Sequence, residues 1–230
     1  MTVYWNSDTE LFDLLRQELF TAVIGDVMDK AGLLHQFLPP NIQPLHPEMV
    51  VAGRAMPVLE ADVFQEVADS ANPLMQKPFG LMLKALDDLN THEVYICTGA
   101  SPRYALWGEL MSTRAQKLGA AGAVTNGYVR DTRGILALQF PTFCYGSYAQ
   151  DQGPRGKVLD FRIPIEIQGV SITPRDIVFG DRDGVCIIPR AHEEEIIAAA
   201  LEKARGEKLV KKAIENGMGA VEAFEKYGIM

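Results

Sequence analysis

The stretch that decides the fold is residues 93–125, EVYICTGASPRYALWGELMSTRAQKLGAAGAVT. EVYICT predicts a buried strand over 93–98, and AGAVT predicts a second strand over 121–125. Between them, residues 108–119 predict a helix that ends at Gly119. Four apolar residues of this helix are expected on one face: Leu110, Met111, Ala115 and Leu118. Two strands that a helix connects in this way are parallel, so the sequence predicts an α/β fold.

The same reasoning extends to both sides of this unit. Upstream, the patterns predict helices over 11–19 and 22–32, a strand over 50–61, and a helix over 78–89 with Pro78 in its first turn. Thr21 is the expected N-cap of the second helix, and Gly32 its C-terminal stop. Downstream of residue 156, short runs separated by Pro and Gly predict a sheet rich in hairpins. A helix over 191–215 and a last segment, AVEAFEKYG, complete the pattern.

Composition limits the classes of protein that are possible. The 230 residues are 47% hydrophobic, which is enough for one domain spanning 1–230 with its own core. A net charge of -8 argues against nucleic acid as a direct partner, because such binding needs a basic surface. Neither a signal peptide nor a membrane-spanning run is present, so the expectation is a cytoplasmic protein. Cys97, Cys144 and Cys186 are far apart, and we expect three buried, reduced thiols.

Two loops carry the residue types that a binding site needs. Gly108–Met111 opens the helix, where free backbone N–H groups could hold a carboxylate. The turn at Asn126-Gly127 follows the second strand and leads to Arg130 and Asp131. An arginine can clamp a carboxylate through two hydrogen bonds, and an aspartate can hold a hard divalent cation. The alternative, which spacing alone favours, is that Arg130 and Asp131 form surface ion pairs in a turn.

Other candidates are weaker. GDRDG (180–184) contains acidic residues but has no EF-hand pattern, so a turn between two strands is the expectation. The histidines, His35, His46, His92 and His192, lack the spacing of a zinc site. No glycine-rich nucleotide-binding motif and no GxSxG nucleophile motif occurs.

GELM (108–111) followed by NGYVRD (126–131) resembles the signature of the RraA-like family, which includes class II 4-hydroxy-4-methyl-2-oxoglutarate/4-carboxy-4-hydroxy-2-oxoadipate aldolases. GDRDGVCIIP (180–189) looks like the family's second conserved segment, and EAFEKYGIM (222–230) is similar to the tail of its aldolases. The resemblance runs from about residue 20 to the C-terminus. It implies a swivelling β/β/α fold with a central mixed sheet flanked by helices, assembled as a homotrimer or homohexamer.

The resemblance also implies roles for single residues. Gly108, Glu109, Leu110 and Met111 would bind the carboxylate of an oxo-acid substrate, Arg130 would contact the substrate, and Asp131 would bind Mg²⁺ or Mn²⁺. Glu109 and Glu207 would act as acidic residues in catalysis, Glu207 from an adjacent subunit. The family's loop often has Asp where this chain has Asn126, and that loss of a charge could alter activity. Loops 60–78 and 144–156 are expected to build the distal part of the pocket.

These roles describe a metal-dependent retro-aldol cleavage that yields pyruvate, with oxaloacetate decarboxylation as a side activity. The cation would act as a Lewis acid, Arg130 would stabilise the enolate, and a metal-bound water steered by Glu109 or Glu207 would be the base. The alternative comes from another class of protein: the family's founding member is a protein inhibitor of ribonuclease activity that works by contact without chemistry. A non-catalytic, protein-binding regulator therefore stays open.

Overall fold

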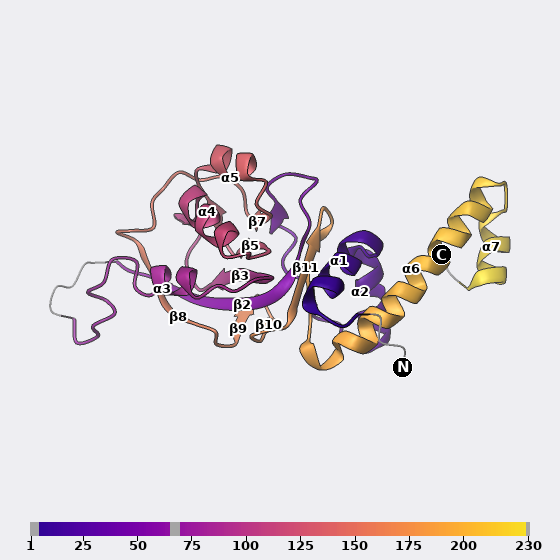
Figure 1. Ribbon diagram of the computed structural model, residues 1–230, viewed down its shortest axis with the longest axis horizontal. Coiled ribbons are helices and arrows are strands. Elements are labelled where there is room, and N and C mark those ends of the chain that lie inside the picture. Colours follow the sequence, from indigo (N-terminus) through magenta and orange to yellow (C-terminus); the bar gives the residue numbers. More distant parts are fainter. Residues whose placement is uncertain (1–4, 65–69, 229–230) are drawn as a thin grey trace. The chain divides into compact units, whose positions relative to one another are not determined.

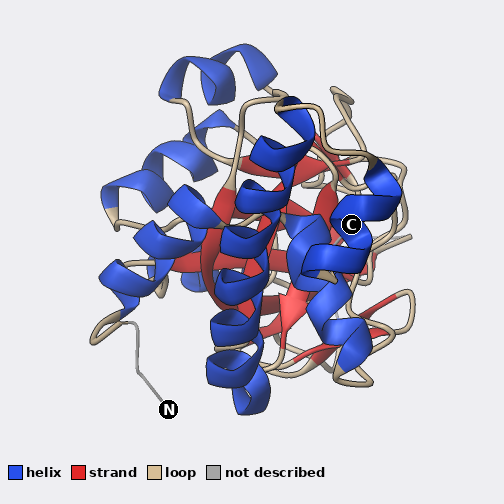
Figure 2. Ribbon diagram, turned by 90° about the vertical axis from the view of Figure 1, so that its right-hand side faces the viewer, coloured by secondary structure: helices blue, strands red, loops and turns tan. Residues whose placement is uncertain are grey.

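The computed structural model describes residues 5–64 and 70–228, and its contacts fall into two compact units. The larger unit is His35–Arg190, and the smaller one combines Met1–Leu34 with Ala191–Met230. The helices predicted near both ends of the chain are present, within residues 8–30 and 193–227. Figure 1 traces both units along the chain, and all the strands drawn red in Figure 2 belong to the larger one.

A mixed sheet of eight strands forms the frame of the larger unit. Its strands are β1 (Gln43–Pro44), β2 (Val51–Asp62), β3 (Glu93–Thr98), β5 (Gly122–Thr125), β7 (Thr142–Cys144), β8 (Gly156–Phe161), β11 (Ile177–Asp181) and β12 (Gly184–Ile188). The order is β1-β7-β5-β3-β2-β11-β12, with β8 paired to the second half of β2. Residues near Phe37 pair with β12 while β1 pairs with β7, so one segment links the two edges and the sheet is nearly closed.

The predicted parallel unit is confirmed. β3 pairs in parallel with β5, from Val94 opposite Gly122 to Cys97 opposite Thr125, and β2 and β7 extend the parallel set on either side. Every residue of β3 is buried. Its side chains alternate between two cores, with Tyr95 on one face and Val94 on the other, because successive strand residues point in opposite directions.

Each face of the sheet has its own cover. On one face lie α3 (Met82–Asp87), α4 (Glu109–Lys117) and α5 (Thr132–Leu138). Figure 1 shows α4 and α5 on the same side of β3 and β5, and Trp107 stacks on Phe140 in the core beneath them. On the other face lies the hairpin of β9 (Ile165–Ile167) and β10 (Val170–Ile172), whose isoleucines and valine enter the second core.

The smaller unit is helical and contains α1 (Asp8–Glu18), α2 (Thr21–Lys30), α6 (Glu193–Glu215) and α7 (Ala220–Tyr227). A short 3-10 turn, Arg190–His192, precedes α6. Leu11 and Leu15 of α1, Ile24 of α2, and Ile197 and Leu201 of α6 are fully buried. Gly32 has a left-handed backbone and ends α2 as predicted, since its φ of +81° costs a glycine little.

Three local predictions are wrong. The helix predicted over 78–89 begins only at Met82, because Phe79 and Gly80 both have positive φ and cannot continue a right-handed helix. Thr21 is not a cap: Phe20 is the N-cap, and Thr21 is the first, buried residue of α2. Leu110 is 82% exposed, so the apolar face of α4 consists of Ala115 with buried Ser112 and partly buried neighbours.

Two other expectations are confirmed, the turn at GDRDG and the three buried thiols. GDRDG is the turn of the β11–β12 hairpin, where the backbone N–H of Asp183 donates to Oδ1 of Asp181 at 2.9 Å. Cys97, Cys144 and Cys186 are buried free thiols. Among the described helices, none is both long and apolar enough to cross a membrane.

Candidate functional site

A pocket of about 260 Å³ lies in the larger unit, where several loops converge above the helix-covered face. It is lined by residues of α3, by the chain around β4 (Ala105–Trp107), by the first residues of α4, and by two loops that end at Asp131 and contain Asp151. Of the predicted site residues, Gly108, Leu110, Met111, Arg130 and Asp131 all line it. The structure therefore brings together two motifs that are separated in the sequence.

A small second sheet explains why these two loops meet. β4 pairs in parallel with β6 (Tyr128–Val129), and the backbone N–H of Arg130 donates to the carbonyl of Trp107 at 2.9 Å. Neither short strand was predicted from the sequence. Because the strands run side by side, the residues that follow them, Gly108 and Arg130, are also neighbours.

Gly108 leaves room for the acidic group beside it. It is the N-cap of α4, with extended backbone angles that any residue can adopt. Its importance is space: a Cβ atom there would lie 3.0 Å from Oδ2 of Asp131 and 3.5 Å from Cγ of Arg130. The first N–H groups of α4 have no partner within the helix, so they are available to an anion next to Asp131.

The charges of the pocket centre on Arg130. Its Nε lies 3.6 Å from Oδ2 of Asp131, and one terminal nitrogen lies 2.8 Å from Oδ1 of Asp151. All three side chains are between 40% and 50% exposed, so they remain open to solvent and to a ligand. Asp131 has a left-handed backbone, with φ of 54°, and is the N-cap residue of α5. The exposed ion pairs of Arg130 are thus part of the wall of the candidate pocket.

Asp151 is a residue that the sequence reasoning did not single out. It belongs to the loop 144–156, which was expected to build part of the pocket, and Gln152 beside it also lines the pocket. Of the other expected loop, 60–78, residues 65–69 lie outside the described part of the chain, and none of the described residues lines this pocket. Nothing in the sequence near Asp151 signals a partner at Arg130, which is 21 positions away.

The two predicted catalytic glutamates do not line this pocket in the described chain. Glu109 is exposed and its carboxyl group lies against α5: a Cβ on Gly134 would be only 2.1 Å from it. Glu207 is on α6 of the helical unit, where it pairs with Lys203 at 3.3 Å. Their proposed roles stay predictions.

Asn126 connects the site loop to the sheet. Its Nδ2 donates to Oγ1 of Thr98 at 2.9 Å, and its Oδ1 accepts from the hydroxyl of Tyr145 at 2.5 Å. Arg130 instead has Asp131 and Asp151 as its ion-pair partners. In this chain the amide of Asn126 anchors the end of β5. The guanidinium of Arg130 is held by the carboxylates of Asp131 and Asp151.

A buried carboxyl group lies behind the pocket. Glu60 is only 2% exposed, and its Oε2 accepts a hydrogen bond from Nε2 of Gln152 at 2.7 Å. Burial raises the pKa of Glu60 to about 8, so at neutral pH this side chain is mostly a neutral acid. Within the described chain, Oε1 of Glu60 and the hydroxyl of Tyr95 have no hydrogen-bond partner. Burial also raises the pKa values of the Cys97 thiol and the Tyr95 phenol.

One carboxylate of the pocket is of the kind that a divalent cation such as magnesium would use. No group of three or more His, Cys, Asp or Glu side chains that could enclose a metal occurs among residues 5–64 and 70–228. Mg²⁺ does not need such a group, since it commonly binds through one or two carboxylates, with waters and substrate oxygens as the other ligands. The accessible carboxylate of Asp131, beside a glycine, provides such a position.

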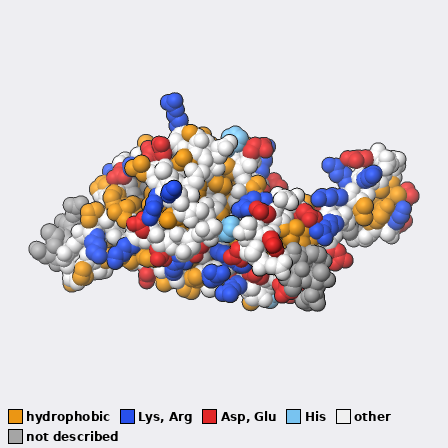
Figure 3. Space-filling view, in the orientation of Figure 1, with side chains coloured by type: hydrophobic (Ala, Val, Ile, Leu, Met, Phe, Trp, Pro, Cys, Tyr) orange, Lys and Arg blue, Asp and Glu red, His pale blue; other side chains and the backbone are white. Residues whose placement is uncertain are grey.

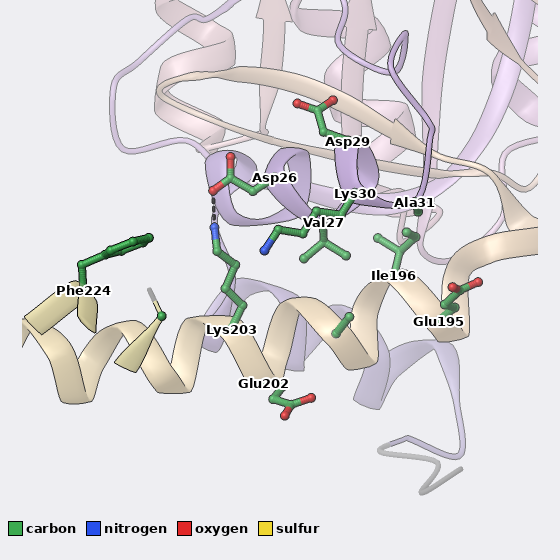
Figure 4. Close-up of a pocket in the computed structure, with 12 residues that line it drawn as sticks. Asp26, Val27, Asp29, Lys30, Ala31, Glu195, Ile196, Glu202, Lys203 and Phe224 are labelled. Atoms are coloured by element: carbon green, nitrogen blue, oxygen red, sulfur yellow. Dashed lines mark hydrogen bonds and ion pairs between the residues drawn. The ribbon is translucent and has the colours of Figure 1, made fainter. Parts of the chain in front are cut away.

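A second, wider hollow lies within the helical unit, between α2, α6 and α7 (Figure 4). In it, Lys203 of α6 reaches to Asp26 of α2, and Phe224 of α7 stands at one end. Hydrophobic side chains, including Val221 and Phe224, are exposed over the C-terminal helices (Figure 3). None of the residues that line this hollow belongs to the two predicted motifs, so the pocket at Arg130 is the candidate site.

The fold and this pocket define a class: α/β proteins with a nearly closed mixed sheet and a site at the N-terminus of a helix. Comparison with known families then identifies the chain as a member of the RraA-like family, "Aldolase/RraA", whose model matches residues 21–187. The family predicted from GELM and NGYVRD is confirmed.

Individual relatives agree with this assignment. Over 206 residues the chain is 32% identical to a protein of Halalkalibacterium halodurans whose name assigns it provisionally to 4-hydroxy-4-methyl-2-oxoglutarate aldolase, with 89% of each chain covered. An uncharacterized protein of Pseudomonas syringae pv. tomato has a similar structure, with a TM-score of 0.81 at 24% identity and coverage of 99% and 98%. RraAS2 of Streptomyces coelicolor, described as an unusual member of the RNase ES inhibitor RraA family, superposes with a TM-score of 0.75 at 20% identity, over 90% of this chain and 98% of that one. Both structures show that the fold is shared, and the predicted swivelling architecture is confirmed.

Proposed function

We propose that the protein is a divalent-metal-dependent aldolase that cleaves a 4-hydroxy-2-oxo diacid into pyruvate and a second 2-oxo acid. The observation that supports it most directly is the convergence of Gly108, Arg130 and Asp131 on one pocket. The homologue from Halalkalibacterium halodurans, whose name refers to this reaction, supports the same activity.

Substrate binding would use both the helix and the arginine. The N–H groups at the start of α4 would hold the carboxylate of the pyruvyl part, because the positive end of a helix favours an anion. The guanidinium of Arg130 would lie next to the 2-oxo oxygen. The apolar wall, which includes Met82, Leu86 and Trp107, excludes water from one side of the substrate and strengthens these polar contacts.

Cleavage requires that negative charge be stabilised as it forms. When the bond between carbons 3 and 4 breaks, its electron pair moves toward the 2-oxo group and gives the enolate of pyruvate. Arg130 would stabilise this charge, and its paired carboxylates would keep the guanidinium in place. Asp131 would hold Mg²⁺ or Mn²⁺, which when bound supplies Lewis acidity at the same oxygens.

Oxaloacetate decarboxylation would follow from the same site, since loss of carbon dioxide from that substrate also leaves a pyruvate enolate. This side activity needs the groups that bind and stabilise the enolate, but it has no 4-hydroxyl proton to remove. Both reactions therefore need the residues that stabilise the enolate. Only aldol cleavage also needs a residue that accepts the 4-hydroxyl proton.

The test is a coupled assay for pyruvate with oxaloacetate and with 4-hydroxy-2-oxo diacids, with and without Mg²⁺. We expect metal-dependent turnover of both, and a loss of about 1,000-fold or more in Asp131→Ala, because a bound cation contributes several kcal/mol to the transition state. Asp183→Asn, an exposed residue of the β11–β12 turn, is the matched control and should keep wild-type rates. Turnover without a divalent cation, or an unimpaired Asp131→Ala, would contradict the proposal.

A second candidate function is a non-catalytic regulator of ribonuclease activity, which the structural similarity to RraAS2 favours. A purified protein that releases no pyruvate from any of these substrates but binds ribonuclease E in a pull-down would support this alternative. Assembly into a homotrimer or homohexamer is part of the first proposal, and light scattering after gel filtration would measure it. If Glu207 contributes from a neighbouring subunit, Glu207→Gln should lower turnover only in the assembled protein.

A further inference from the structure

We propose that Asp151 is the general base of the pocket, the group that accepts the 4-hydroxyl proton of the substrate during aldol cleavage. This inference rests on the proposed aldolase function and assigns a role in it to a residue outside both family motifs. Asp151 lines the pocket in the described chain, whereas Glu109 and Glu207, whose roles stay predictions, do not.

The position of Asp151 separates it from the metal-binding candidate. Asp131 and Asp151 are the only acidic residues among the described residues that line the pocket. They meet different nitrogens of the same guanidinium, since Asp131 lies near Nε and Asp151 near a terminal nitrogen of Arg130. A substrate that sits against Arg130 is therefore within reach of two carboxylates, one to hold the cation and one to accept a proton.

The local structure holds the Asp151 carboxylate in one orientation. Its Oδ1 contacts Arg130 at 2.8 Å, and its Oδ2 accepts from the backbone N–H of Gly153 at 3.1 Å. Arg155 donates to the backbone carbonyl of Asp151 at 3.0 Å. Each carboxylate oxygen has two lone-pair positions, so a hydroxyl proton can still be accepted. A general base needs this combination of fixed geometry and a remaining acceptor site.

Gln152, the next residue, fixes the loop from behind. Its side-chain amide donates to Glu60 at 2.7 Å, and its backbone carbonyl accepts from the N–H groups of Arg155 and Gly156. Consecutive residues of one loop thus have different partners, Arg130 for Asp151 and the buried Glu60 for Gln152. Glu60 and Gln152 are positioning residues for the base.

The step is balanced without any further reactant. The Asp151 carboxylate takes the proton from the 4-hydroxyl oxygen, the C4–O bond becomes a carbonyl, and the bond between carbons 3 and 4 breaks. The electron pair of that bond becomes the pyruvate enolate. Protonation of the enolate at carbon 3 by the protonated Asp151, directly or through one water, gives pyruvate and regenerates the carboxylate.

Asp151→Asn is the decisive variant, because it keeps the shape and removes the basic oxygen. We expect kcat for aldol cleavage to fall at least about 100-fold, which is the lower end of the contribution of general base catalysis. Oxaloacetate decarboxylation, which has no hydroxyl proton to remove, should fall much less, so the ratio of the two rates should change by at least about 30-fold. Asp160→Asn, an exposed residue of β8, is the matched control and should leave the ratio unchanged.

Three outcomes would overturn the assignment. An equal loss of both activities would mean that Asp151 only orients Arg130. A gain in kcat/KM for the hydroxy acid would mean that Asp151 competes with the substrate for the arginine. A wild-type protein that catalyses neither reaction would remove the proposed function itself, and this result is visible before any variant is made. Circular dichroism checks that the variant is folded, and Asp151→Ala repeats the comparison if Asp151→Asn is not.

Discussion

The entrance of the candidate pocket and the buried layer behind it, here called the floor, both contain carboxyl groups, yet their surroundings differ completely. At the entrance, Asp131 and Asp151 are about half exposed and lie against Arg130. On the floor, Glu60 is almost fully buried and its hydrogen-bond partner is the neutral amide of Gln152. Only one peptide bond, between Asp151 and Gln152, separates the two environments.

This difference shows how one loop can serve two kinds of chemistry. Water and the guanidinium of Arg130 surround the carboxylates of the entrance, so this side of the loop is open to a cation and to a substrate. Burial without a cation favours the protonated form, so Glu60 contributes a neutral hydrogen-bonding group to the scaffold. Asp131, Asp151 and Glu60 all carry a carboxyl group. Their different surroundings give the two aspartates and the glutamate different roles.

The largest expected effect concerns the floor. Burial raises the pKa of Glu60 from 4.5 to about 8, so between these values the native state keeps a proton that the unfolded state releases. Stability should therefore fall as pH rises from about 5 to 8, by an amount on the order of a few kcal/mol. Urea unfolding at several pH values measures this slope.

Glu60→Gln should remove most of that pH dependence, because an amide does not titrate in this range. The exposed Glu166 provides the matched control, and Glu166→Gln should keep the wild-type slope. If wild type and Glu60→Gln lost stability in parallel between pH 5 and 8, Glu60 would be ionised in the folded protein, and the contrast between floor and entrance would be wrong.

The next effect concerns space at the entrance. In Gly108→Ala the new methyl group would lie 3.0 Å from Oδ2 of Asp131, closer than side chains ordinarily pack. The carboxylate would have to move, and we expect kcat/KM for both substrates to fall about 10- to 100-fold, since small displacements of catalytic groups have effects of this size. Thermal unfolding should change little, because the extended backbone of Gly108 suits alanine.

Gly219→Ala is the control for this substitution. A methyl group added to Gly219 would have nothing within 4 Å, and the residue has an ordinary negative φ, so activity should stay at the wild-type value. Full activity in Gly108→Ala would show that the position of Asp131 is not critical, and the entrance would then be an ordinary surface ion pair.

Much of the entrance could be predicted from the sequence because its signals are local. A strand, a helix and a second strand within residues 93–125 fix which loop ends lie together, and the Arg-Asp pair follows directly. The helix start at Gly108 was also correct. These features depend on the chain within a few residues of each motif, where periodicity and glycine positions carry the information.

The floor could not be predicted, because its contacts join distant segments. Glu60 and Gln152 are 92 residues apart, and nothing near either residue indicates that β2 buries a carboxyl group. The same limit applies to Leu110: its spacing fitted the apolar face of α4, but in the fold it is an exposed residue at the pocket. Whether a side chain faces a core, a pocket or water is decided by the packing of other elements.

The smallest expected effect tests what holds the entrance to the sheet. In Tyr145→Phe, Oδ1 of Asn126 loses a hydrogen bond of 2.5 Å, and we expect a loss of about 1 kcal/mol in the free energy of unfolding, the usual contribution of one such bond. Activity should fall less than about 10-fold, because Arg130 keeps both of its carboxylate partners.

Asn126→Asp is the informative companion, because it restores the residue that the family often has at this position. A carboxylate can still accept from Tyr145, and the Thr98 hydroxyl can rotate to donate in place of accepting. Both activities should therefore stay within about 3-fold of wild type, a range of under about 1 kcal/mol. A much larger gain in activity would show that the aspartate acts on Arg130 directly. The guanidinium would then depend on the sheet as well as on Asp131 and Asp151, and the entrance would no longer be independent of the structure behind it.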